Sequence, residues 1–141
     1  MTIDTAQRRG AVEPSRAVLY GVLTLAALSV IGALVSVAGD LSPSLLDAMG
    51  PDGRLSIPLP MIAVQLALAV AAGSRRRRFA LAGSGLLAAA LFVSVLSGFF
   101  DGGYSDDRLT ALERVCQVTL VGALTTVGVV AAVRFWRVLR G

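Results

Sequence analysis

Four long stretches of this chain contain no charged residue, and polar or charged segments separate them. Each stretch consists mostly of Leu, Ala, Val and Ile, without the alternation of apolar and polar residues that marks a membrane strand. A helix needs about 20 apolar residues to cross a bilayer. The pattern therefore predicts an all-α integral membrane protein, a four-transmembrane-helix antiparallel bundle. The uncharged stretches are Ala17–Gly39, Leu55–Ser74, Phe79–Phe100 and Val115–Val133.

The residues at the ends of these stretches set the expected helix bounds. Thr110 and Glu113 have the spacing of a capping box, so the fourth helix is expected to begin before its uncharged stretch. Ser74 and four arginines are all that separate the second and third stretches, which predicts antiparallel neighbours joined by a tight turn. Residues 17–134 then form a single membrane domain between two tails, 1–16 and 135–141. Its helices are expected at about 17–39, 55–74, 79–100 and 110–134.

The connection between the first and second stretches carries helix signals of its own. Ser42 is a candidate N-cap, with Pro43 at the first helical position. Leu45, Leu46 and Met49 follow with apolar side chains before Gly50 and Pro51 end the segment. We therefore expect a short helix lying in the membrane interface.

The arginines predict the orientation of the bundle. All 13 basic residues are arginines, and the chain has 9 acidic residues. On the side that holds both termini, the segments carry ten arginines and two acids, against three arginines and seven acids on the other side. Basic residues near helix ends favour the cytoplasmic side. We therefore expect both termini inside, in the cytoplasmic membrane, and no nucleic-acid partner for this basic chain.

A secretory signal peptide is the alternative interpretation of the first stretch. Ser36-Val37-Ala38 resembles a small-residue cleavage site. The apolar region of a signal peptide runs about 7–15 residues, whereas this stretch runs 23. The length favours an uncleaved first helix.

The predicted membrane core lacks most of the residue types that catalysis requires. The chain has one cysteine and no histidine, and no carboxylate, amine or imidazole lies within the four stretches. Proton relays and ion-coupled pumps require ionisable groups at that depth. We expect a non-enzymatic accessory or scaffold protein without cofactor or metal, with lipid chemistry on the outer carboxylates as a further alternative. The absence of lysine beside abundant Ala, Val, Gly and Arg suggests a G+C-rich bacterial genome.

Gln65 is the one amide near the middle of the second stretch. An unpaired amide at that depth is costly, so the side chain is expected to have a polar contact within the membrane. The first interpretation is a hydrogen bond between helices. The second is a small transporter or channel, assembled as an oligomer, with a pathway between subunits near Gln65.

Two further groups of residues are candidate contact sites. The arginines of the tight turn, Arg75, Arg76, Arg77 and Arg78, are expected to contact anionic headgroups on the cytoplasmic side. The outer segment that holds Asp101, Tyr104, Asp106 and Asp107 offers an acidic interaction surface. Its carboxylates could also hold a divalent cation, although helix termination and capping explain the same residues. The expected partners are membrane lipids and either a second copy of the chain or a larger membrane protein.

Overall fold

The computed structural model describes residues 15–51, 53, 55–100, 104, 107 and 109–141. Within these residues the chain forms five α-helices, of which α2, α5 and α6 are long and apolar enough to cross a membrane. The all-helical class predicted from the uncharged stretches is confirmed at this level. The helices are α2 (Ala17–Ala38), α3 (Leu45–Ala48), α4 (Leu59–Ala72), α5 (Arg77–Phe100) and α6 (Ala111–Arg140).

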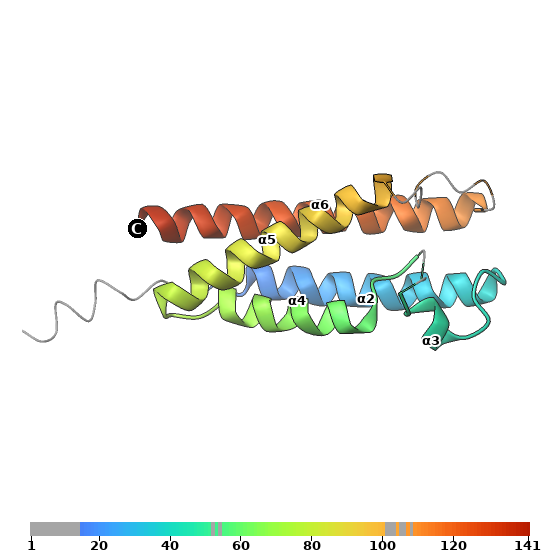
Figure 1. Cartoon of the computed structure of the whole chain (residues 1–141), viewed down its shortest axis with the longest axis horizontal. Coiled ribbons are helices and arrows are strands. Elements are labelled where there is room, and N and C mark those ends of the chain that lie inside the picture. The colour runs from blue at the N-terminus through green and yellow to red at the C-terminus, as the bar shows by residue number, and fades with distance from the viewer. Residues whose placement is uncertain (1–14, 52, 54, 101–103, 105–106, 108) are drawn as a thin grey trace, which may run out of the picture.

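The four longer helices pack side by side with alternating direction (Figure 1). Helix α4 contacts α2 and α5, and α6 contacts α5 and α2. The start of α2 and the C-terminus lie at one end, and α3 lies toward the other. Larger apolar side chains such as Leu25, Leu87 and Leu91 fill the interior, while Leu86 and Val93 remain exposed. Soluble proteins rarely expose large contiguous apolar patches, so these outward-facing side chains suit a lipid environment.

Helices α4 and α5 approach each other closely at Gly83. A Cβ added there would lie 2.7 Å from the Leu68 carbonyl oxygen and 2.8 Å from the Ala71 carbonyl carbon. Small residues let helix backbones come this near. Gly83 therefore permits the close packing of α4 and α5, the two neighbours expected from the short arginine turn.

Helix α4 is shorter than the stretch that predicted it. It has 14 residues, Leu59–Ala72, in place of the expected 55–74. At 1.5 Å per residue the helix is about 21 Å long, too short to span the hydrocarbon core alone. Pro58 is the N-cap, and proline disfavours helical conformation at the residue before it, Ile57. At the other end, Gly73 is the C-cap.

The residues before α4, Leu55 to Pro58, run into the bundle outside any helix. Leu55 and Ile57 are buried, with 1% and 6% of their surface exposed. The Ile57 backbone N–H donates to the Ser29 hydroxyl of α2 at 3.0 Å. Non-helical backbone is tolerated at membrane depth where the protein itself buries and satisfies it. This segment therefore completes the packing around α2 beyond the start of α4.

The connection before this segment holds the short helix expected there, but the cap differs from the prediction. Helix α3 has Ser44 as its N-cap, and the Ser44 hydroxyl accepts a hydrogen bond from the Asp47 backbone N–H at 3.1 Å. Ser42, the predicted cap, instead shares a hydrogen bond with the Ser36 hydroxyl of α2 at 2.9 Å. Helix α3 therefore starts two residues later than predicted, and Ser42 contacts α2 in place of capping α3.

Helix α6 begins as the capping-box spacing predicted. Thr110 is the N-cap, and its side chain and that of Glu113 make both reciprocal bonds of the box. The helix continues to Arg140, past the expected end at 134. Arg137 and Arg140 lie in the last turn, where basic side chains interact favourably with the helix dipole.

Candidate functional site

Gln65 lies in the interior of the bundle, and its amide has no polar partner in the part of the chain that the structure describes. Only 2% of its surface is exposed, and neither its Oε1 nor its Nε2 has a hydrogen-bond partner among the described residues. The hydrogen bond between helices that the sequence suggested is therefore not made within that part of the chain. A buried polar group left unsatisfied costs about 1–3 kcal/mol. The amide is thus available to a small polar ligand or a water molecule that reaches the core.

The buried serine hydroxyls, by contrast, are already committed to contacts within the chain. Ser29 accepts from the Ile57 backbone N–H, and Ser84 donates to the Ala80 carbonyl oxygen one turn earlier in α5. On the exposed face of α6, Thr125 and Thr126 donate to carbonyl oxygens of their own helix. These hydroxyl groups bond within the fold, whereas both polar side-chain atoms of Gln65 lack a hydrogen-bond partner among the described residues.

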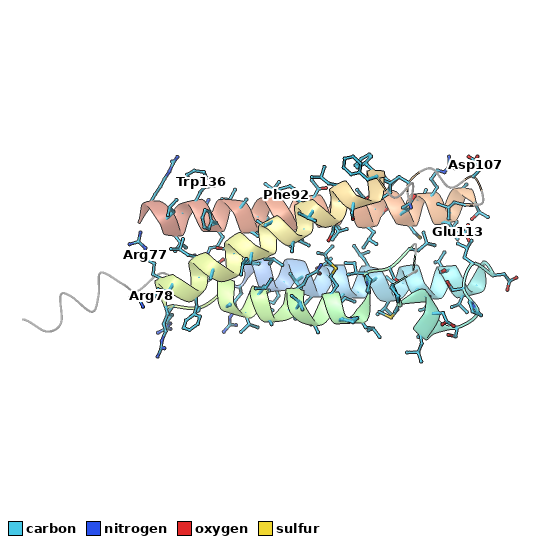
Figure 2. The ribbon with its side chains drawn as sticks, in the orientation of Figure 1. Arg77, Arg78, Phe92, Asp107, Glu113 and Trp136 are labelled. Carbon is cyan, nitrogen blue, oxygen red and sulfur yellow. The ribbon has the colours of Figure 1, made fainter. Side chains whose placement is uncertain are left out.

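The structure divides the four-arginine turn into side chains with different surroundings. Arg77 is half-buried and donates from its Nη2 to the Leu139 carbonyl oxygen at the end of α6, at 3.0 Å. Arg75, Arg76 and Arg78 are exposed. Figure 2 shows Arg77 and Arg78 at the same end of the bundle as Trp136. The turn is therefore not a uniform patch, because Arg77 is tied to α6.

A groove of about 470 Å³ opens beside this turn, between the start of α2 and the end of α4. Its volume lies within the range of about 300–1,000 Å³ that is common for ligand sites. Arg16 and Arg75 both line it, so the structure brings together two arginines far apart in the sequence. Arg16 was not among the residues predicted to contact lipid, although its place just before the first uncharged stretch put it on the same predicted side as the arginine turn. The lining residues are Ser15, Arg16, Leu19, Ala69, Val70, Gly73 and Arg75.

At the opposite end, Tyr104 folds back onto α5. Its hydroxyl donates to the Val95 carbonyl oxygen at 3.1 Å, and its ring stands edge-on to Phe99 with ring centres 4.8 Å apart. A Cβ added at Gly98 would lie 2.8 Å from the Tyr104 ring atom Cε1, so this glycine makes room for the ring. Burial raises the pKa of the Tyr104 hydroxyl above its ordinary value. The side chain is engaged within the chain, although it remains partly accessible.

The acidic residues of this outer segment are described only in part. Asp107 is exposed (Figure 2), whereas Asp101 and Asp106 lie outside the described residues. In the part of the chain that the structure describes, no three acidic, cysteine or histidine side chains cluster so that they could hold a metal ion. The divalent-cation interpretation needs Asp101 and Asp106, so it stays a prediction.

Glu113 is a buried carboxylate that joins two helices. Only 2% of its surface is exposed, and its Oε2 accepts from the backbone N–H and the hydroxyl of Thr110 at 2.6 and 2.8 Å. Its carboxylate also lies against Gly39, the C-cap of α2, where an added Cβ would be 3.4 Å from Cδ. The sequence predicted the cap but not this contact between α6 and α2.

The described residues thus contain an unpartnered buried amide, a groove lined by two arginines, and, at the end of the bundle opposite the groove, Tyr104 and Glu113 bonded within the chain. The groove and the contact of Glu113 with Gly39 join helices that are separate in the sequence. No protein-family model matches the chain, and no match is found among the curated proteins or the solved structures.

Proposed function

We propose that this chain is a multi-pass protein of the bacterial cytoplasmic membrane with a non-enzymatic accessory or scaffold role. In this proposal α2, α4, α5 and α6 all cross the bilayer. Helix α4 contributes about 21 Å, and the four non-helical residues before it add at most about 13 Å, the length of a fully extended chain at 3.3 Å per residue. The two together match a hydrocarbon core of about 30 Å. The bond between the Ile57 N–H and Ser29 supports this crossing, because it satisfies a non-helical backbone group within the protein.

The proposed orientation has both termini in the cytoplasm. Its support is the excess of arginines in the segments on the side of the termini, ten against three. Reporter fusions after Gly50 and Tyr104 should report an outside location, and fusions after Arg78 and Gly141 an inside location. A cytoplasmic signal after Tyr104 would contradict the four-crossing arrangement. A mature chain that begins near Gly39 would likewise contradict an uncleaved first helix.

The accessory role is carried by one observation, that several buried polar groups are committed to bonds within the chain. The hydroxyls of Ser29 and Ser84 and the carboxylate of Glu113 all bond to groups of the same chain. A core built in this way serves as a stable support for a partner, which we propose is a larger membrane protein. Extraction in mild detergent followed by identification of co-purifying proteins tests this. A stoichiometric partner supports the proposal, and a homo-oligomer that retains no other protein contradicts it.

Gln65 favours a second candidate function, a small transporter or channel. Its amide is a buried polar group with no hydrogen-bond partner among the described residues. Because the side chain is buried within its own bundle, a polar solute would pass through each subunit, and the pathway between subunits that the sequence suggested would not reach the amide. Gln65→Leu with retained fold and abolished flux in liposomes would establish this function. Unchanged flux in the Gln65→Leu variant would show that the Gln65 amide does not contact a transported solute, and would contradict this function.

A further inference from the structure

The groove between α2 and α4 combines two kinds of surface. Arg16, at the start of α2, and Arg75, just after α4, supply two exposed guanidinium groups. Leu19 and Val70 line the same groove with apolar side chains, and 63% of the Val70 surface is exposed. A ligand that fits such a surface needs an anionic end and an apolar body.

We propose that this groove binds one anionic phospholipid. Its phosphate lies between the guanidinium groups of Arg16 and Arg75, and an acyl chain follows Leu19 and Val70 along the outside of the bundle. Arginine suits this role because its planar group donates paired hydrogen bonds to phosphate oxygens. The charges of the described residues are complementary, since none of those that line the groove or form the first turn of α2 is acidic.

The packing of the bundle keeps the two arginines at the same groove. Gly73, the C-cap of α4, lies against the start of α2, where an added Cβ would be 3.1 Å from the Ser15 carbonyl oxygen. Arg77 is occupied by the end of α6, and neither Arg76 nor Arg78 lines the groove. The site is therefore more specific than the attraction of any arginine to an anionic membrane surface, which contributes about 1 kcal/mol for each residue.

The proposed orientation determines only which leaflet supplies the lipid. Binding of the lipid to the groove does not depend on it. Native mass spectrometry of the full chain in detergent tests binding itself, with phosphatidylglycerol and phosphatidylcholine of the same acyl chains as probes. We expect one phosphatidylglycerol retained per chain, with an affinity roughly tenfold above that for phosphatidylcholine. If reporter fusions reverse the orientation while this preference persists, the proposed topology fails and the lipid site stands.

Two double variants separate the groove from general charge. Arg16→Gln with Arg75→Gln should lower the affinity for phosphatidylglycerol roughly tenfold. The matched control, Arg76→Gln with Arg78→Gln, removes the same charge from exposed side chains of the same turn and should leave the affinity nearly unchanged. All four side chains are exposed, so both variants should keep the unfolding temperature of the parent protein. An equal loss of affinity in the two variants would overturn the proposal, as would equal retention of both lipids.

A competition experiment identifies which part of the ligand the groove holds. Glycerol 3-phosphate has the anionic group of the lipid but no acyl chains. We expect that a large excess of glycerol 3-phosphate does not displace phosphatidylglycerol, because Leu19 and Val70 contact the acyl chains of the lipid and not its headgroup. Displacement at a concentration similar to that of the lipid would show a site for phosphate alone, and would overturn the assignment to a phospholipid.

Discussion

Replacing Gly32 with alanine should disrupt the contact between α2 and the segment that precedes α4. Gly32 lies in the middle of α2 and is buried against Leu55. A Cβ added at Gly32 would overlap the Leu55 carbonyl oxygen and lie 2.9 Å from the carbonyl carbon. Both atoms belong to the backbone, so no side-chain rotation can relieve the overlap. Either the Leu55 segment or α2 must move.

The expected cost follows from three contributions. Overpacking a filled site costs about 1–3 kcal/mol, and a backbone obstacle places this change at the upper end. Moving the segment also weakens the hydrogen bond from the Ile57 N–H to Ser29, which contributes about 0.5–1.5 kcal/mol. Alanine recovers up to about 1 kcal/mol through its higher helix propensity. Gly32→Ala should therefore lower the free energy of unfolding by about 3 kcal/mol.

Gly122→Ala is the matched control. Gly122 lies within α6, is exposed, and has no atom within 4 Å of an added Cβ. The same substitution there should leave the free energy of unfolding unchanged or raise it by up to about 1 kcal/mol. Denaturant unfolding in detergent, followed by circular dichroism, measures both variants.

A labelling experiment locates the damage. With Cys116→Ser removing the native thiol, Leu55→Cys places a probe at a position that is 1% exposed. A water-soluble maleimide should react slowly with this thiol in the parent protein and several times faster when Gly32→Ala is added. If Gly32→Ala is as stable as Gly122→Ala and the thiol stays protected, the close packing of Leu55 on α2 is wrong.

Three further predictions concern other sites. Gln65→Met should raise the free energy of unfolding by about 1–3 kcal/mol, because it removes an unpartnered buried amide. Gln117→Met should lower it, since Gln117 has an interaction partner, and a loss of stability at Gln65 would show that this amide is satisfied in the membrane. Thr110→Ala should cost about 1 kcal/mol through loss of the capping box; Thr110→Ser should restore most of it, and equal stability of all three forms would refute the role of the cap. In a Tyr20→Phe background, ultraviolet titration should give a midpoint for Tyr104 above its ordinary pKa near 10. Because the fold favours the neutral hydroxyl, its contribution to stability is present below pH 10 and is lost as the pH rises through the raised pKa; a midpoint at or below the ordinary value would contradict the burial of Tyr104.

The helices themselves were accessible to sequence reasoning because their causes are local. An uncharged stretch of Leu, Ala, Val and Ile favours a helix in lipid whatever its neighbours, and α2 and α5 begin within two residues of the predicted positions. The capping box of α6 is equally local, since Thr110 and Glu113 lie within one turn of each other.

The start of α4 was predicted four residues too early, at Leu55 in place of Leu59. Pro58 and Pro60 both disfavour helical conformation at the residue before them. These prolines indicate a helix start later than Leu55, but the predicted start followed the uncharged stretch, which begins at Leu55. A run of apolar residues is compatible with a helix or with a buried extended segment, and periodicity alone does not separate the two.

The sequence by itself determined the helical class, the apolar stretches and the local caps, because these depend on residues close together in the chain. Tertiary packing decided the features that bear on function. Ser29 could accept from Ile57, and Arg16 could meet Arg75, only once α2 lay beside α4. The missing partner of Gln65 has the same origin, since the residues that surround a buried amide come from neighbouring helices. Such contacts depend on how far each helix is rotated about its axis, and a single sequence with apolar residues on every face does not specify that rotation.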